Sequence, residues 1–485
     1  MFTTLLLSLS CAPQGDLPTA THHRGAPPNF VIVLVDDLGY GDLGAGLPGI
    51  GGRTEHRTPN ISRLAAQGLV LTQGYAAAPN CAPSRACLQT GRTTPRHGIY
   101  TVGSAARGKP PLRELIPVQN TTVLADEEQT LAEHLRGAGY TSAHLGKWHL
   151  GDDPTTQGYD FNVGGNKAGH PKSYFSPYKN DDLEDGPDGE YLTTRLTDEA
   201  IGLLGKMEPP FLLHLAYFSV HTPLQAPPQR VKERRAAGVK SAKYAAMVEA
   251  LDHEVGRLLG ALKEAGLAED TVVVFTSDNG GHMPVTNQEI LRGYKGTLDE
   301  GGVRVPWIVR WPGRIEPGVS ETPVHHVDLL PTLLTLANVE PDEGLVLDGV
   351  DLTGLLTGGT GPGARPLFWH FPCYLQGKSD RFEHFRTTPG GSLRAGPWKL
   401  IEYFHPGSTA APRLELYDLS ADPLESTDVS AAQPARTAAM YADLVRWRET
   451  VEAPVPTDPE PLFEGTGSEG TGPEGTEPGA TGGGS

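Results

Sequence analysis

The feature that most constrains the fold is an uninterrupted apolar run near the start of the chain. Residues Phe30 to Val35 are all apolar and rich in valine and isoleucine, which is typical of a strand buried on both faces of a parallel sheet. Similar segments recur, separated by stretches with helical periodicity. The expected strands are 141–145, 211–218, 272–276 and 306–311, and the expected helices begin after Pro59 or cover 130–137, 244–265 and 329–336. This alternation predicts an α/β domain whose large, mixed, mostly parallel sheet is sandwiched by helices.

A second region, residues 364–452, has a different pattern. Residues 393–403 and 414–419 are expected antiparallel strands, and a helix is expected over 434–449, because proline at 434 suits a first helical turn. This pattern predicts a smaller C-terminal α+β subdomain built on an antiparallel sheet. The predicted division of the whole chain is a leader and tether (1–28), the α/β domain (29–363), the C-terminal subdomain (364–452) and a disordered tail rich in Gly, Thr, Glu and Pro (453–485).

Charge and cysteine content narrow the class of protein further. The 485 residues carry a formal net charge of −18, which argues against nucleic acid as a partner. An anionic small substrate stays compatible with this balance, since local charge can oppose net charge. The four cysteines are too few for a disulfide scaffold, so each thiol needs its own explanation. They are Cys11, Cys81, Cys87 and Cys373.

The first cysteine follows a short stretch of apolar and small residues, 2–10. This order resembles a shortened export signal that ends at the lipid-modified cysteine of a bacterial lipoprotein. The stretch lacks Lys and Arg, which a mis-assigned start codon would explain; the alternative is a frayed N-terminus of a cytoplasmic protein. We expect an exported protein, periplasmic or held at the membrane by a lipid anchor on Cys11.

The segment CAPSRACLQTGR, residues 81–92, carries the most specific information about function. Taken alone, Cys81 could be a small buried hydrophobe, a partner of Cys87 in a disulfide, or a thiolate nucleophile activated by Arg85 and a helix N-terminus. The Cys-x-Pro-x-Arg pattern with Thr-Gly-Arg downstream favours a fourth interpretation. It resembles the signature of the type I, formylglycine-dependent sulfatases of the alkaline-phosphatase superfamily, of the arylsulfatase or N-acetylgalactosamine-sulfatase-like kind. The resemblance extends over roughly residues 28–450.

The resemblance implies that a formylglycine-generating maturation enzyme oxidises Cys81 to formylglycine. The hydrate of that aldehyde is a geminal diol, so one hydroxyl can attack sulfur and the other can collapse to expel sulfate. Covalent catalysis of this kind divides one difficult displacement into two easier steps. A serine at the same place could be sulfated but could not release sulfate by this route. The implied activity is hydrolysis of a sulfuric ester.

Oxygen-bearing side chains follow two of the expected strands. Asp36 and Asp37 end the first strand, and Asp278 and Asn279 follow the strand at 272–276. All-oxygen ligand sets suit Ca²⁺, with Mg²⁺ as the alternate. Paired aspartates alone are often only solvated turn residues. The sulfatase resemblance implies that these four side chains bind Ca²⁺ beside residue 81, whose formylglycine completes the set.

The resemblance also implies a ring of cationic and imidazole groups around the sulfate. Lys147 and His149 belong to a Gly-Lys-Trp-His motif that binds the formylglycine hydrate, and His221 contacts the sulfate and the leaving oxygen. Lys295 binds sulfate, and together with Arg85 these groups would stabilise charge on the sulfuryl oxygens. We expect His221, with Lys295 beside it, to protonate the departing alcohol, and His149 to deprotonate the diol.

Loops rich in aromatic and polar residues indicate a sulfated carbohydrate, or an aryl sulfate, as the substrate. Each of their residues could equally serve ordinary loop packing. The candidate substrate contacts are His170, Trp369, His370 and His384. Three alternatives stay open: a phosphatase or phosphodiesterase of the alkaline-phosphatase superfamily, an unmodified homologue that only binds sulfated glycans, and a hydrolase that uses the Cys81 thiol directly.

Overall fold

The computed structural model describes residues 27–287, 289–342, 344–406 and 412–464. The predicted leader, with Cys11, and the end of the predicted tail lie outside the described residues, so export and the lipid anchor stay predictions. Among the described residues, none of the helices combines the length and apolar character that a bilayer crossing requires.

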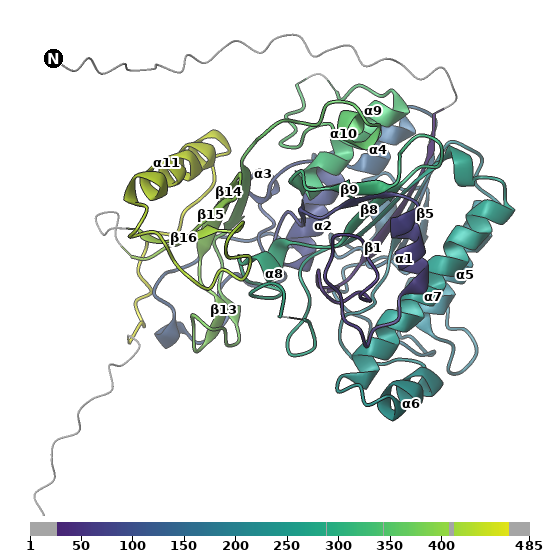
Figure 1. Cartoon of the computed structure of the whole chain (residues 1–485), viewed down its shortest axis with the longest axis horizontal. Helices are drawn as coiled ribbons and strands as arrows, with labels where there is room; N and C mark the ends of the chain where they lie inside the picture. Colours follow the sequence, from purple (N-terminus) through teal and green to yellow (C-terminus); the bar gives the residue numbers. More distant parts are fainter. Residues whose placement is uncertain (1–26, 288, 343, 407–411, 465–485) are drawn as a thin grey trace, which may run out of the picture.

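The larger part of the molecule is built on an eight-stranded sheet, drawn mainly from purple to teal in Figure 1. Neighbouring strands are parallel from β5 to β7 and between β2 and β9, whereas β8 runs antiparallel to both β7 and β2. The mixed, mostly parallel α/β sheet expected from the sequence is confirmed. In spatial order the strands are β5 (Phe161–Val163), β4 (Thr141–Gly146), β6 (Phe211–Ala216), β1 (Asn29–Val35), β7 (Thr271–Ser277), β8 (Trp307–Arg310), β2 (Leu69–Leu71) and β9 (Gly318–Ser320).

Helices cover both faces of this sheet, because the side chains of a strand alternate between its faces. In the central strand β1, Val31, Val33 and Val35 belong to the core under α1, α5 and α7. Phe30, Ile32 and Leu34 belong to the core under α2, α4, α9 and α10. The helices are α1 (Pro59–Ala66), α2 (Cys81–Thr90), α3 (Thr94–His97), α4 (Leu131–Arg136), α5 (Leu192–Leu204), α6 (Pro228–Ala236), α7 (Ala242–Glu264), α8 (Glu300–Val303), α9 (Leu329–Ala337) and α10 (Thr353–Leu356).

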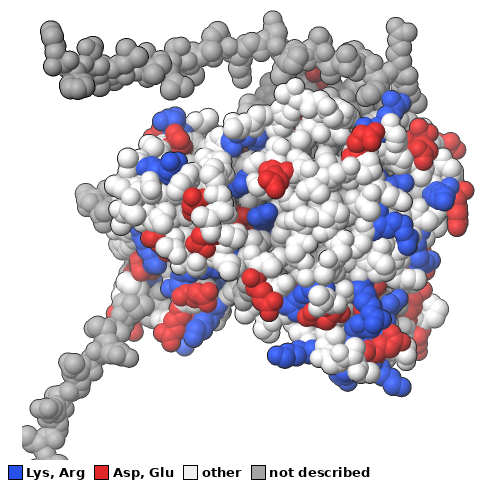
Figure 2. All heavy atoms as spheres, in the orientation of Figure 1, with Lys and Arg blue, Asp and Glu red and all other residues white. Residues whose placement is uncertain are grey.

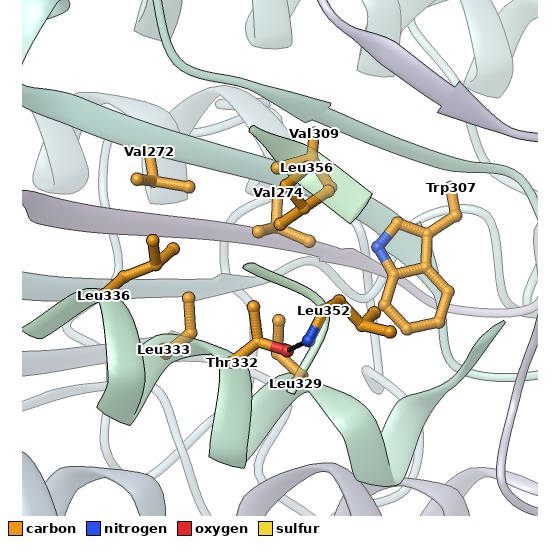
Figure 3. A pocket seen from close by; sticks show the side chains of 10 residues that line it. All are labelled: Val272, Val274, Trp307, Val309, Leu329, Thr332, Leu333, Leu336, Leu352 and Leu356. Atoms are coloured by element: carbon orange, nitrogen blue, oxygen red, sulfur yellow. Dashed lines mark hydrogen bonds between the residues drawn. The ribbon is translucent and has the colours of Figure 1, made fainter. Parts of the chain in front are cut away.

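Figure 3 shows the second of these cores from close by, where α9 packs on β7 and β8. Leucines of α9 and α10 face the valines of the strands and Trp307 across a small apolar cavity of about 10 Å³. The Thr332 hydroxyl accepts a hydrogen bond from the Leu352 amide at 2.9 Å, whereas the buried indole N–H of Trp307 has no hydrogen-bond partner among the described residues. A void of this kind is a minor packing defect.

The C-terminal subdomain is the α+β unit that the sequence predicts, with α11 (Pro434–Thr450) packed on its antiparallel sheet. One expected strand is wrong: residues 393–403 form two strands joined at Gly396, whose positive φ of 58° allows the tight turn. Its strands are β11 (Leu367–Phe371), β14 (Gly390–Ala395), β15 (Trp398–Tyr403) and β16 (Arg413–Asp418), and a small pair is formed by β12 (Leu375–Gln376) and β13 (Phe385–Thr387). A second small pair, β3 (Gly74–Tyr75) with β10 (Val324–His325), belongs to the larger domain.

The predicted start of the tail at residue 453 is too early. Residues 458–464 lie along the segment 111–116 of the larger domain and pair with it through backbone hydrogen bonds. The Arg113 guanidinium also contacts the Glu460 carboxylate at 2.7 Å. A composition rich in Pro and Glu disfavours a core of its own, but it does not prevent a short segment from pairing with a formed edge.

Charge does not separate into two regions on the face drawn in Figure 2, where acidic and basic side chains are interspersed over the surface. This face therefore does not show the cationic side chains that we expect to bind an anionic substrate, and we look for them inside the candidate site.

Candidate active site

The predicted site residues follow four neighbouring strands of the sheet. These strands, β4, β6, β1 and β7, are parallel and adjacent, so their carboxyl ends meet at one edge. In that order they are followed by Lys147 and His149, by His221, by Asp36 and Asp37, and by Asp278 and Asn279. The topology therefore brings together residues that are more than 200 positions apart in the sequence.

Backbone hydrogen bonds hold the segments beyond these strand ends in register. The Asp36 amide donates to the Ser219 carbonyl at 2.9 Å, and the Asp278 amide donates to the Val35 carbonyl at 3.0 Å. The Lys147 amide donates to the Ala216 carbonyl at 2.8 Å. Each side chain of the site thus starts from a fixed backbone position at the edge of the sheet.

Cys81 is the first residue of helix α2. The Asn80 side chain caps the helix by accepting a hydrogen bond from the Cys81 amide at 3.0 Å. Arg85 lies one turn further along, and residues four apart lie on the same face of a helix, so both side chains face the strand ends. Sequence reasoning missed Asn80; an Asn directly before a proline-containing first turn was the signal that could have found it.

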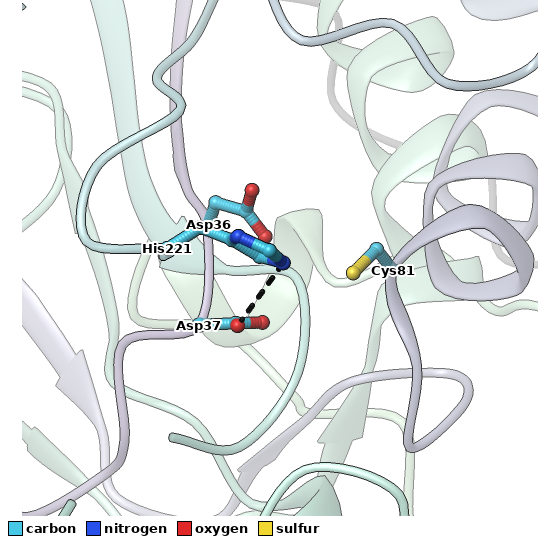
Figure 4. A group of neighbouring side chains, drawn as sticks. All are labelled: Asp36, Asp37, Cys81 and His221. Carbon is cyan, nitrogen blue, oxygen red and sulfur yellow. Dashed lines mark ion pairs between the residues drawn. The ribbon is translucent and has the colours of Figure 1, made fainter. Parts of the chain in front are cut away.

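The cationic side chains contact the acidic ones directly. Lys147 Nζ lies 2.7 Å from Asp36 Oδ2, and Lys295 Nζ lies 2.6 Å from Asp37 Oδ1. Lys295 Nζ also lies 2.8 Å from the Cys81 sulfur. Figure 4 shows Cys81 pointing from α2 toward Asp36, Asp37 and His221, with the sulfur facing the same space as their polar atoms.

Arg85 completes this network from the helix side. Its Nε and Nη2 atoms both lie 2.9 Å from Asp278 Oδ2, and its Nη1 donates to the Lys147 carbonyl at 2.6 Å. Arg85 therefore fixes α2 to two of the strand ends at once.

Burial and charge shift the acidity of these groups in opposite directions. Burial raises the pKa of Asp36 to about 8, in spite of the neighbouring Lys147 ammonium. Burial acts in the same sense on Asp37, but Lys295 and His221 outweigh it and lower the pKa of Asp37. Burial raises the pKa of the Cys81 thiol to about 11, although Lys147 and Lys295 oppose this shift. An unmodified Cys81 is thus a neutral thiol at pH 7, which disfavours its direct use as a nucleophile.

Three buried oxygens of the site have no hydrogen-bond partner among the described residues. They are Asp36 Oδ1, Asp37 Oδ2 and Asn279 Oδ1. Ligand atoms of Asp36, Asp37, Cys81 and His221 all lie within 4.8 Å of one another, the single group of this kind in the described part of the chain. Buried oxygens are costly to leave unsatisfied, and carboxylate and amide oxygens suit a hard divalent cation. The residues present therefore fit Ca²⁺ or Mg²⁺.

The three predicted histidines differ in their surroundings. His149, at a positive φ of 65°, has a buried Nδ1 without a hydrogen-bond partner among the described residues. His221 is half-buried, with Nε2 at 3.6 Å from Asp37 Oδ2. Burial lowers the pKa of both imidazoles, that of His221 to about 3. The exposed His170 ring stacks on the His221 ring, with the ring centres 6.0 Å apart, so His170 stays a candidate substrate contact.

Two of the predicted substrate contacts belong instead to the core of the C-terminal subdomain. Trp369 is 1 % exposed and its indole N–H donates to the Ala76 carbonyl at 2.8 Å. His370 is 2 % exposed and its Nε2 contacts the Pro454 carbonyl at 2.9 Å. Because both side chains are buried against β14 and neighbouring segments of the same chain, neither can contact a substrate. His384 is exposed beside β13 and stays a candidate.

The three cysteines in the described residues are free and buried, so Cys81 and Cys87 form no disulfide. Cys87 lies in α2 with its sulfur 3.3 Å from His97 Nε2. The disulfide interpretation of the CAPSRAC segment is wrong, and Cys87 contributes to packing.

Comparisons with known proteins show the family to which the chain belongs. The family model described as Sulfatase matches residues 28–339, and the model described as N-sulphoglucosamine sulphohydrolase, C-terminal, matches residues 294–448. The chain is 35 % identical over 404 residues to N-acetylgalactosamine-6-sulfatase of Canis lupus familiaris, covering 76 % of this chain and 72 % of that protein. It is 33 % identical over 455 residues to human arylsulfatase A, covering 82 % and 83 %.

A solved structure with the same fold is that of Ps i-CgsB, with a TM-score of 0.70 and 28 % identity over 87 % of this chain and 92 % of that one. The α/β fold, the strand-end site and the sequence matches together define a class: the chain belongs to the sulfatase family. It is a sulfuric ester hydrolase.

Proposed function

We propose that this sulfatase removes sulfate from a sulfated carbohydrate, with residue 81 acting as formylglycine beside a bound Ca²⁺, or Mg²⁺ in its place. The observation that carries the proposal is the set of buried oxygens of Asp36, Asp37 and Asn279 without hydrogen-bond partners, of which those of Asp36 and Asp37 face Cys81 at the N-terminus of α2. A sugar substrate is supported by the relative named N-acetylgalactosamine-6-sulfatase and by the structure of Ps i-CgsB in complex with k-i-k-neocarrahexaose.

Asp36, Asp37, Asp278 and Asn279 would hold the metal ion. When bound, the ion supplies Lewis-acid polarisation of the sulfate oxygens. The formylglycine hydrate supplies an oxygen nucleophile and a second hydroxyl through which sulfate can be released.

The remaining residues hold the anion and move protons. Lys147, Lys295 and Arg85 are buried cations at fixed positions, so they can stabilise charge that grows on the sulfuryl oxygens without reorganising. His149 offers its unpartnered Nδ1 to take a proton from the residue 81 hydroxyl. His221 lies half-buried beside Asp37 and is neutral in the empty site. A sulfate bound beside it would raise its pKa, so that it can deliver a proton to the leaving alcohol oxygen with Lys295 beside it.

Mass spectrometry of the peptide containing residue 81 tests the nucleophile. Protein from a host that contains the maturation enzyme should show formylglycine, and it should release sulfate from 4-nitrophenyl sulfate and from N-acetylgalactosamine 6-sulfate. Intact cysteine in an active preparation would contradict the mechanism. Faster hydrolysis of a phosphate ester than of the matching sulfate ester would favour the phosphatase alternative. Formylglycine without any sulfate release would favour a protein that only binds glycans.

A further inference from the structure

Two arginines that the proposed function does not use, Arg107 and Arg386, lie beside the Cys81 site. Arg386 belongs to β13, and its side chain packs against Gly296, the residue that follows Lys295. A Cβ placed on Gly296 would lie 3.5 Å from Arg386 Cδ. The Arg386 guanidinium carbon is 6.0 Å from the centre of the Tyr294 ring. Because Lys295 Nζ contacts the Cys81 sulfur, Arg386 flanks the group that is expected to bind sulfate.

The loop 101–109 brings Arg107 to the same place. At its start, the Asn80 side chain, next to Cys81, donates to the Thr101 hydroxyl at 3.0 Å. Near its end, a Cβ placed on Gly108 would lie 2.6 Å from the ring of Phe385, the residue before Arg386. The loop therefore runs from the cap of α2 to β13 and carries Arg107 between them.

Neither guanidinium has a carboxylate partner among the described residues. Arg107 donates only to the Val102 carbonyl, and both side chains are half-buried. The acidic residues of the β12–β13 connection do not compensate: Asp380 lies 4.0 Å from Arg292, and the exposed Glu383 forms no ion pair with either arginine. Burial and the nearby Arg386 guanidinium lower the pKa of Arg107.

Such an arrangement is unfavourable in the empty protein. Two like charges that are near each other and partly shielded from water repel, and each loses hydration without gaining an opposite charge. An oxyanion between them would relieve the repulsion and accept charge-assisted hydrogen bonds, for which the planar guanidinium is well suited.

We propose that Arg107 and Arg386 form a subsite for a second anionic group, a sulfate or a carboxylate, of the saccharide whose sulfate ester is cleaved at residue 81. This inference rests on the proposed function and narrows it: the preferred substrate is a sugar with at least two anionic groups, rather than a monosulfated sugar or a simple aryl sulfate.

The test measures binding to the Cys81→Ala protein, which retains the other residues of the site but has no nucleophile that the sulfated sugars could react with. Dissociation constants are measured by calorimetry for N-acetylgalactosamine 6-sulfate, for its 4,6-disulfate, and for a chondroitin 6-sulfate tetrasaccharide that carries carboxylates. The added variants are Arg107→Gln and Arg386→Gln. The matched control is Arg310→Gln, because Arg310 is also half-buried but belongs to β8 opposite Val273, toward the other edge of the sheet.

We expect at least one multiply charged saccharide to bind about tenfold or more tightly than the monosulfated sugar, and either arginine variant to remove most of that preference. Arg310→Gln should keep it. A preference for the disulfate indicates a subsite for a second sulfate on the same sugar, and a preference for the tetrasaccharide alone indicates a subsite for an anionic group of a neighbouring sugar. Equal binding of all three saccharides would overturn the inference, as would a preference that survives both variants.

Failure of the proposed function gives a different result. Matured wild-type protein that releases no sulfate from any of these saccharides contradicts the proposed function, while the binding preference still reports on the subsite. Matured protein that hydrolyses all three saccharides with equal kcat/KM, and whose Arg386→Gln variant is unchanged, supports the proposed function and contradicts the subsite.

Discussion

Two clusters of buried charge both use residues of the segment 278–304, and they are built in different ways. The catalytic cluster comprises Asp36, Asp37, Asp278 and Asn279 with Arg85, Lys147 and Lys295. The junction cluster joins the two domains and comprises Asp299, Glu300 and Glu425 with Arg304, Arg381 and Lys399. Both are almost fully removed from water.

The difference lies in which oxygens are left without partners. In the junction cluster every carboxylate is ion-paired: Lys399 Nζ lies 3.0 Å from Glu300 and 3.1 Å from Glu425, and Arg381 lies 2.5 Å from Asp299. Glu425 Oε1 lacks a hydrogen bond but still lies 3.1 Å from the Lys399 ammonium. In the catalytic cluster each aspartate also contacts a cation, yet Asp36 Oδ1 has neither a hydrogen bond nor an ion pair among the described residues, and Asp37 Oδ2 has only the 3.6 Å contact with His221 Nε2. Carboxylates that are fully ion-paired fix the geometry of a domain junction, whereas carboxylates that keep an oxygen without a partner can bind a cation.

The two clusters are also connected. The Glu425 carboxylate accepts a hydrogen bond from the Glu300 amide at 2.7 Å, and the Glu425 carbonyl accepts one from Arg292 at 2.5 Å. These contacts hold both sides of the turn that carries Lys295. The junction cluster therefore supports the catalytic cluster without taking part in its chemistry.

The largest expected effect comes from Cys81→Ala. It should reduce sulfate release by about 10⁴-fold or more, because no other side chain of the site can supply the formylglycine chemistry. The melting temperature should change little, since alanine keeps the capped helix start and leaves only a small space. Cys87→Ala is the matched control in the same helix: its sulfur faces His97, and activity should be retained. Comparable activity of Cys81→Ala would show that another nucleophile operates.

Asp37→Asn separates the clusters by their response to cations. It should lower kcat/KM by about 10³-fold, because it removes a charged ligand beside the reacting group. Added Ca²⁺ should raise the melting temperature of chelator-treated wild-type protein, since a ligand that binds only the folded state stabilises it. The variant should lose this response, while Lys399→Met should keep it. If thorough removal of divalent ions leaves the activity and the melting temperature of the wild-type protein unchanged, the metal has no part in the proposed function.

Lys399→Met has the opposite signature. Removing the Lys399 ammonium leaves buried Glu425 without an ion-pair partner among the described residues and Glu300 with Arg304 alone, which should lower the free energy of unfolding by about 3–5 kcal/mol. Urea unfolding measures the loss, and Lys263→Met at the exposed end of α7 is the control. Activity per folded molecule at low temperature should fall far less than in Asp37→Asn. A stable but inactive Lys399→Met protein would contradict the assignment of Lys399 to structure.

The strands and their order along the chain could be predicted because each is a dense apolar run with clear limits. The catalytic cluster could be placed at one edge because parallel strands end together, and the signature around Cys81 indicated the family. Roles carried by single side chains were predicted less well. Trp369 and His370 look like sugar-binding residues in sequence, but only the packing of β11 against β14 and the segment around 454 shows that they are buried.

The junction cluster could not be predicted for a physical reason. Glu300, Lys399 and Glu425 are far apart in sequence and come from different domains, and a charged residue in sequence gives no sign that it will be buried. Nor could the position of Arg107 and Arg386 be predicted, because they come together only where a loop and a β-hairpin meet beside Lys295. Hydrophobic periodicity predicts which face of a helix or strand is buried, but it does not predict contacts between irregular segments.

The smallest effect distinguishes the junction cluster by its dependence on pH. Burial disfavours the Glu300 carboxylate, but Lys399 and Arg304 outweigh this and lower its pKa from 4.5 to about 2. The stabilisation is therefore complete above pH 4.5 and is lost as the pH falls toward 2, because the unfolded chain binds the proton first. Burial raises the pKa of Glu425 to about 8, so its contribution changes above pH 4.5, outside this window.

Glu300→Gln should consequently flatten the loss of stability between pH 4.5 and 2.5, by up to about 1.4 kcal/mol per pH unit. Urea midpoints across this range measure the slope, with Glu264→Gln at the exposed end of α7 as the control. Parallel curves for Glu300→Gln and wild type would mean that Glu300 gains nothing from its pairing with Lys399, and the contrast between a paired and an unsatisfied cluster would fail.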